Sequence, residues 1–141
     1  MSKKRARALT IWQPWASLIL AGDKEYETRG WATRYRGPLV IHASKRWGSD
    51  QREICERWPY RQLVGALMPT GPEGEWLPSL GMCLGVVDLI GVFPTNSKNL
   101  VLSDQERALG DFRPGRYAWR LANPRLFKEP VYQSGAQGFG S

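Results

Sequence analysis

The alternation of hydrophobic and polar positions predicts most of the strands of this chain. Residues 24–29 alternate with a period of two, so that Lys24, Tyr26 and Thr28 share one side of the predicted strand. The run 82–93 is almost continuously apolar, which favours a strand in the middle of a sheet that bends or bulges at its glycines. The other segments with a strand pattern are 8–12, 39–44, 117–121 and a last strand that begins at residue 131.

Helical spacing and helix-end signals occur in three short segments, residues 14–21, 50–58 and 104–109. In the second, Ile54, Cys55 and Trp58 are predicted to face inward. Residues 68–81 are rich in Pro and Gly and are predicted to form a loop, and residues 123–124 a turn. The expected end signals are Pro14 and Gly22 for the first helix, Ser49 and Pro59 for the second, and a capping box of Ser103 with Glu106 for the third.

Several curving strands with short helices between them predict an α+β fold, a small curved β-barrel with short helices packed around it. A parallel α/β fold is excluded because strands and helices do not alternate regularly. The chain has 141 residues, 42% of them hydrophobic, which is enough for a single core. We therefore expect one domain over residues 8–141, preceded by a flexible basic arm at residues 1–7.

The hydrophobic pattern also bears on the location of the protein. No apolar run approaches the roughly 20 residues that a membrane-spanning helix needs. The first residues lack the apolar core and cleavage site of a signal peptide. We expect a cytoplasmic monomer with no membrane partner.

Charge is distributed unevenly along the chain. Residues 1–61 contain 13 basic and 6 acidic side chains, whereas residues 62–141 contain 7 of each, so the net charge of +7 belongs to the first part. Five of the seven tryptophans lie in the same part. Basic residues interleaved with large aromatics suit a surface that contacts phosphates and stacks bases, although a solvated basic face over a tryptophan core would show the same composition.

The cysteines and the histidine restrict the chemistry. Cys55, Cys83 and His42 are the only residues of their types, so this chain alone cannot form a four-ligand Cys/His zinc site. Both cysteines lie in apolar surroundings and are interpreted as buried thiols. We expect no metal, no nucleotide cofactor and no other cofactor.

Three segments, taken together, resemble the ASCH family, whose members have a PUA-like fold. Residues 13–16 read Gln-Pro-Trp-Ala, and residues 22–29 follow the pattern Gly-x-Lys-x-x-Glu-x-Arg. Residues 35–44, Tyr-Arg-Gly-Pro-Leu-Val-Ile-His-Ala-Ser, are similar to the strand that follows this signature. Pro130 and the run Gly-Ala-Gln-Gly-Phe at residues 135–139 resemble the closing segment. The likeness is greatest to the coactivator-type ASCH domains.

The resemblance implies a barrel with a groove at its first helix-to-strand junction. Members of the family are associated with binding RNA or DNA, one branch deacetylates acetylcytidine, and at least one relative is a ribonuclease. The amidohydrolase branch carries a threonine three residues after its lysine. Here Glu27 stands three residues after Lys24, and Thr28 follows, so this sequence departs from that branch.

We therefore predict a nucleic-acid-binding domain, with RNA favoured and DNA possible. Lysine binds phosphate as a point charge and arginine through paired hydrogen bonds. Glu27 and Arg29 share a strand face, where their simplest role is an ion pair that orients the arginine. Trp31 is the best candidate for an exposed stacking ring. The candidate binding residues are Lys24, Arg29, Trp31, Arg34, Arg36, Ser44, Lys45, Arg46, Arg52 and Gln137.

Two alternatives remain open at this point. The first is a hydrolase, either a ribonuclease or an amidohydrolase acting on a modified nucleoside, centred on a deprotonated Lys24. Its candidate catalytic residues are Lys24, Glu27, Thr28 and His42. The second is a protein-interaction module whose basic face meets an acidic partner.

Overall fold

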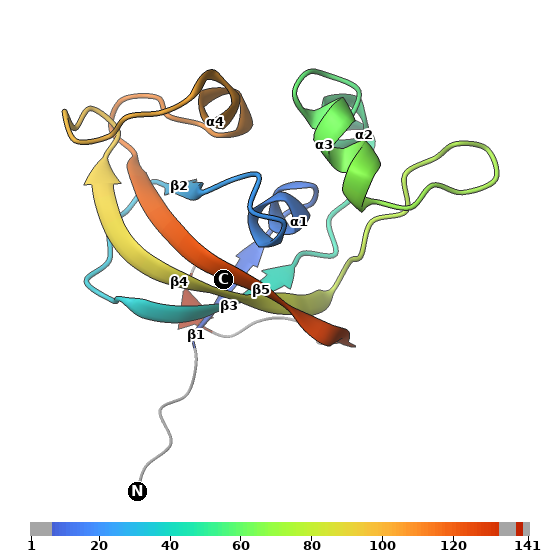
Figure 1. Ribbon diagram of the computed structural model, residues 1–141, viewed down its shortest axis with the longest axis horizontal. Coiled ribbons are helices and arrows are strands. Elements are labelled where there is room, and N and C mark those ends of the chain that lie inside the picture. Colours follow the sequence, from blue (N-terminus) through green and yellow to red (C-terminus); the bar gives the residue numbers. More distant parts are fainter. Residues whose placement is uncertain (1–6, 133–137, 140–141) are drawn as a thin grey trace, which may run out of the picture.

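The computed structural model describes residues 7–132 and 138–139 of the chain (Figure 1). Within this part, no helix is long and apolar enough to cross a membrane. The strands are β1 (Arg7–Ile11), β2 (Tyr26–Arg29), β3 (Gly37–Ala43), β4 (Met82–Pro94), β5 (Tyr117–Tyr132) and β6 (Gly138–Phe139). The helices are α1 (Trp15–Leu20), α2 (Ser49–Ile54), α3 (Tyr60–Leu67) and α4 (Asp104–Leu109).

The strands form one mixed sheet in the order β2-β5-β4-β3-β1-β6. Strand β1 is parallel to its neighbours β3 and β6, and the other pairs are antiparallel. The predicted α+β class agrees with this architecture, but the predicted barrel is not closed. Among the described residues, the short strands β2 and β6 are the two edges of the sheet and do not pair with each other.

The curvature that suggested a barrel comes from the two longest strands, β4 and β5 (Figure 1). Their register shifts between Cys83 and Gly85 and again between Leu89 and Gly91, as the glycines of this run predicted. The predicted turn at residues 123–124 is wrong, because β5 continues through it. Asn123 instead adopts a positive φ of 53° inside the strand, and its side chain donates a hydrogen bond to Asp88.

The helices that follow β3 differ from the prediction. Helix α2 ends at Ile54, and Gly48 rather than Ser49 caps it, because the Gln51 side chain accepts a hydrogen bond from the Gly48 backbone N–H. Trp58 lies outside the helix and is 61% exposed, so its predicted inward position is wrong. Helix α3 was not predicted. By contrast, α4 begins as predicted, with the Ser103 hydroxyl accepting from the Glu106 backbone N–H.

Two hydrophobic clusters hold the sheet and the helices together. The first lies on the concave side of the sheet around Leu9, Leu39 and Trp119, all of which are fully buried. The second joins α1 to the α2, α3 and α4 region around Leu18 and Val64. The partly buried side chain of Trp15 contacts both clusters, which fixes the helices over one end of the sheet.

The basic arm is only partly covered by the described residues. Arg7, which was predicted to belong to the arm, is the first residue of β1, and its guanidinium lies 4.9 Å from the centre of the Tyr35 ring. The residues before Arg7 lie outside the described part of the chain.

Candidate functional site: a basic and aromatic cleft

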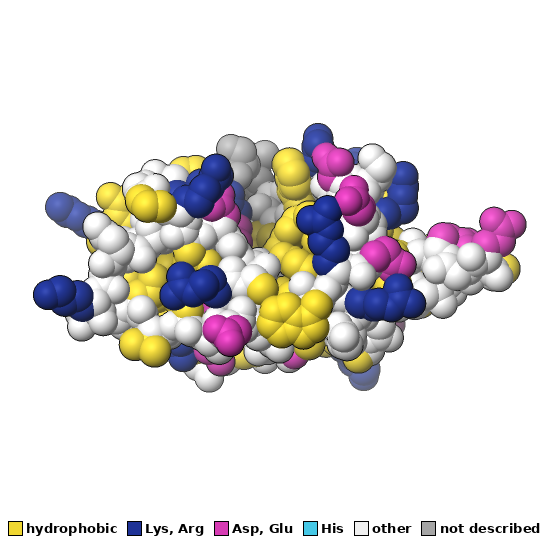
Figure 2. All heavy atoms as spheres, turned by 90° about the horizontal axis from the view of Figure 1, so that it is seen from above, with side chains coloured by type: hydrophobic (Ala, Val, Ile, Leu, Met, Phe, Trp, Pro, Cys, Tyr) yellow, Lys and Arg dark blue, Asp and Glu magenta, His cyan; other side chains and the backbone are white. Residues whose placement is uncertain are grey.

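A cleft of about 1050 Å³ lies where β1 and β3 end, between α4 on one side and α3 on the other. From above, apolar side chains gather in the hollow between these two helical regions, with basic side chains around it (Figure 2). The lining residues are Thr10, Ile11, Trp12, Trp15, Lys24, Glu27, Thr28, Arg29, Gly30, Trp31, His42, Ser44, Lys45, Tyr60, Leu109, Gly110, Asp111 and Arg116. The cleft thus combines groups from segments that are far apart in the sequence.

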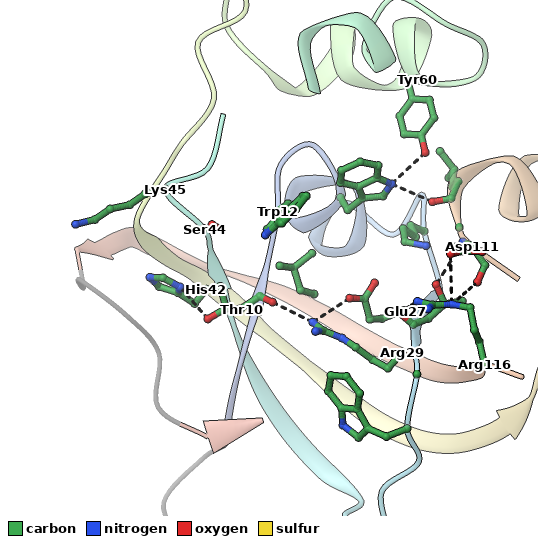
Figure 3. A pocket seen from close by; sticks show the side chains of 18 residues that line it. Thr10, Trp12, Glu27, Arg29, His42, Ser44, Lys45, Tyr60, Asp111 and Arg116 are labelled. Atoms are coloured by element: carbon green, nitrogen blue, oxygen red, sulfur yellow. Dashed lines mark hydrogen bonds and ion pairs between the residues drawn. The ribbon is translucent and has the colours of Figure 1, made fainter. Parts of the chain in front are cut away.

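Arg29 occupies the centre of the cleft (Figure 3). Its Nη2 donates to the Thr10 backbone carbonyl at 2.9 Å and lies 3.0 Å from Glu27 Oε2. Its guanidinium also lies 5.6 Å from the centre of the Trp31 ring. The Glu27 and Arg29 ion pair is therefore present, and together with Thr10 it fixes the direction of the guanidinium.

Lys24 and Glu106 form a buried pair behind the cleft. Lys24 Nζ lies 3.8 Å from Glu106 Oε2, and both atoms are buried without a hydrogen-bond partner among the described residues. Glu106 Oε1 accepts from the Glu25 backbone N–H at 2.8 Å. Burial lowers the pKa of Lys24, and the nearby Glu27 and Glu106 oppose this shift only in part. Burial raises the pKa of Glu106.

Asp111 and Arg116, which follow α4, also line the cleft. Arg116 Nε donates to the Asp111 carbonyl, and its Nη2 donates to the Thr28 carbonyl. Its Nε also lies 3.5 Å from the Asp111 carboxylate. Hydrogen bonds from the exposed Arg113 lower the pKa of Asp111 to about 2, so this carboxylate stays ionised near neutral pH.

Two half-exposed tryptophans stand at the mouth of the cleft. Trp12 is 47% exposed and Trp31 46% exposed, so part of each ring is open to a ligand. The Arg46 guanidinium covers Trp12 at 4.4 Å from the ring centre, and Trp119 packs edge-on against Trp31. Trp15, in contrast, is a packing residue whose Nε1 donates to the Tyr60 hydroxyl and to the Leu109 carbonyl.

His42 and Thr28 are buried in the walls. His42 Nδ1 lies 3.2 Å from the Thr10 hydroxyl, and His42 also lines the cleft. The Thr28 hydroxyl accepts from the Asp111 backbone N–H. In the part of the chain that the structure describes, no group of three His, Cys, Asp or Glu side chains is placed to hold a metal ion.

The structure brings most of the predicted site residues together. Those that line the cleft are Lys24, Glu27, Thr28, Arg29, Trp31, His42, Ser44 and Lys45. Arg46 is exposed beside it, on Trp12. Three predicted residues do not line it: Arg34 and Arg36 are exposed on the turn before β3, and Arg52 is exposed on α2. Gln137 lies outside the described residues.

The lining residues that sequence reasoning did not assign to the site include Thr10, Tyr60, Asp111 and Arg116. Tyr60 could have been found, because Pro59 followed by apolar positions at 60, 63, 64 and 67 is a helix-start pattern. No local pattern indicates Arg116, which reaches Thr28 across 88 residues of sequence.

This fold and its cleft define a small α+β domain with a mixed, strongly curved sheet and a basic, aromatic cleft at the first helix-to-strand junction. The chain belongs to the ASCH domain family, whose model matches residues 9–131. The predicted family is therefore confirmed.

Comparisons with individual proteins agree with this family assignment. Over 82 residues, the chain is 40% identical to the human and mouse proteins named Activating signal cointegrator 1. This segment is 58% of the present chain but only 13% of each relative. A solved structure of a point mutant of the ASCH protein from Zymomonas mobilis matches with a TM-score of 0.50 at 14% identity. The match covers 92% of this chain and 76% of that one, which supports the fold.

Proposed function

We propose that this domain binds single-stranded nucleic acid, with RNA favoured, in the cleft around Arg29. The observation that carries the proposal is the juxtaposition of an oriented arginine with two half-exposed tryptophans and the exposed basic pair Lys45 and Arg46. Stacking rings beside a positive surface are what single strands require, because every base has a flat face and every nucleotide carries a phosphate. In this proposal the domain acts as a monomer inside the cell.

Salt dependence tests this proposal. A chain that neutralises phosphates loses affinity as salt rises, with a log-log slope set by the number of contacts. We expect Lys45→Ala to reduce this slope by about 0.7 to 1 for a single-stranded RNA, because one phosphate contact is lost. Fluorescence anisotropy at several salt concentrations, with the RNA and a DNA of matching sequence, measures both the slope and the preference.

Lys98→Ala is the matched control, since Lys98 is exposed and does not line the cleft. We expect this variant to keep the wild-type slope. An affinity that does not change with salt would contradict the proposal. If the wild type binds no nucleic acid even at low salt, an acidic protein becomes the preferred partner of the basic face.

A hydrolase is the second candidate, and it has one specific observation in its favour. The lowered pKa of Lys24 increases the neutral fraction of its amine, which an amine needs in order to act as nucleophile or base. Glu27 and Glu106, both near Lys24, are the groups available for proton transfer. A ribonuclease or an amidohydrolase would use this cluster.

Incubation of labelled RNA and of acetylated cytidine with the wild type and with Lys24→Ala separates the two functions. Under the binding proposal we expect no turnover by either protein at any pH or with any metal tested, because Lys24 is buried and paired. Turnover by the wild type that Lys24→Ala abolishes would establish the enzyme instead. Circular dichroism of the variant confirms that a loss of turnover is not a loss of folding.

A further inference from the structure

Each positively charged side chain inside the cleft lies near a carboxylate. Its three inner cations each have their own carboxylate: Lys24 has Glu106 at 3.8 Å, Arg29 has Glu27 at 3.0 Å, and Arg116 has Asp111 at 3.5 Å. Asp111 is also shared with Arg113, which does not line the cleft. A phosphate that entered would lose its water and compete with these carboxylates for the cations, although Lys24 Nζ and Arg29 Nε form no hydrogen bond with the described residues. The interior is therefore poorly suited to a phosphate.

The rim of the cleft differs from the interior in how its cations are paired. Lys45 is exposed and lines the opening, and it forms no salt bridge with any described residue. Arg46 follows it, is exposed, and places its guanidinium 4.4 Å from the centre of the Trp12 ring. These two side chains can meet a phosphate in water, where it keeps most of its hydration.

The shape and the chemical groups of the interior suit a flat heterocycle rather than a phosphate. Its lining includes the aromatic side chains of Trp12 and Trp31 and the apolar side chain of Ile11. Arg29 and Glu27 place donors and acceptors at its centre (Figure 3). A base offers two flat faces and an edge of adjacent donors and acceptors, so it can satisfy both kinds of wall. The cleft volume of about 1050 Å³ is slightly above that of ordinary ligand pockets, which is about 300–1,000 Å³. The cleft therefore has ample space for one nucleotide.

We propose that the cleft takes the base of one unpaired nucleotide into its interior, while the flanking phosphates stay outside on Lys45 and Arg46. This inference rests on the proposed function and adds to it which part of the nucleotide enters. A base in a duplex is stacked on both faces and paired at its edge. It is therefore unable to enter, and single strands or extruded nucleotides are the ligands that follow.

An abasic strand tests the proposal, because it keeps the phosphates and lacks the bases. We compare a short single-stranded RNA with an abasic oligonucleotide of equal length at several salt concentrations. We expect the base-bearing strand to bind at least about tenfold more tightly, with the same salt slope, because the phosphate contacts are the same. Equal affinities would overturn the proposal and leave nucleic-acid binding intact. Binding of neither strand would overturn the proposed function and this inference with it.

A substitution that fills the cleft tests whether the base binds inside the cleft or stacks on its outer surface. Ser44 lines the cleft from the end of β3, so Ser44→Phe places a ring in the space. We expect this variant to bind both strands with the affinity of the abasic one. Thr10→Phe fills the same space from β1. Thermal unfolding of both variants shows whether they are folded, so that a loss of binding can be assigned to the filled cleft and not to local misfolding. A full base preference in both folded variants would overturn the proposal.

Discussion

Glu106→Ala is expected to lower the free energy of unfolding by about 3–5 kcal/mol, because it leaves Lys24 as a buried cation without its partner. The same substitution removes the acceptor for the Glu25 backbone N–H. Chemical denaturation monitored by tryptophan fluorescence measures this change. Glu106→Gln keeps an acceptor for that N–H and removes the charge, so it isolates the part of the loss that comes from Lys24.

The loss in Glu106→Ala should depend on pH in a known direction. Burial already lowers the pKa of Lys24 in the folded protein, and removing the carboxylate lowers it further. Between this lowered value and the ordinary value of 10.5, the unfolded chain binds more protons at Lys24 than the folded chain. Both proteins therefore gain stability as the pH rises through this window, but the variant begins to gain it at a lower pH. Its stability relative to the wild type should rise between the two lowered pKa values of Lys24 and stay level above them.

An exposed ion pair provides the control. Glu53 and Arg57 lie 2.6 Å apart on the surface, closer than Lys24 and Glu106, yet solvent screens them. Glu53→Ala should cost no more than about 1 kcal/mol. If Glu106→Ala costs as little as Glu53→Ala, the buried pair does not stabilise the fold.

Trp12→Ala and Trp31→Ala should each weaken binding of single-stranded RNA by about 1–3 kcal/mol, which is roughly 5- to 150-fold. Both rings are about half exposed at the cleft, so truncation removes a stacking surface without opening the core. Each variant also removes the ring beside a cation, Arg46 for Trp12 and Arg29 for Trp31. Isothermal titration or fluorescence anisotropy at fixed salt measures both.

Trp58 is the matched control for this experiment. It is 61% exposed but does not line the cleft, so Trp58→Ala should leave the affinity unchanged. Trp12→Phe should retain most of the affinity, because a smaller ring still stacks. Equal losses for Trp12, Trp31 and Trp58 would mean that the tryptophans contribute through general hydrophobicity rather than through this cleft.

Much of the fold could be predicted from local patterns. The capping box at Ser103 and the glycines of β4 act within a few residues of themselves, so the sequence displays them directly. Closure of the sheet into a barrel depends instead on whether the two edge strands are long enough to pair with each other. No local sequence pattern indicates this. The predicted barrel was wrong for this reason.

The candidate site likewise combines residues that local patterns indicate with residues that only the folded chain brings together. Glu27 and Arg29 lie two positions apart on β2, and Trp31 follows two residues later. Spacing within one chain segment was enough to bring these three residues together. Asp111 and Arg116 come from the segment after α4 and reach Thr28 only through the folded sheet. Arg52 was predicted to belong to the rim of the site, but its side chain is exposed on α2 and does not line the cleft.

The most direct test of the central claim is an NMR titration of the isotope-labelled domain with a short single-stranded RNA. The indole N–H groups of Trp12 and Trp31 report on the two sides of the cleft mouth, and the backbone of Lys45 reports on its rim. We predict that these signals shift together and saturate at one common concentration of RNA. Shifts that leave both indoles unchanged and gather on the exposed far half of β5 would contradict the account.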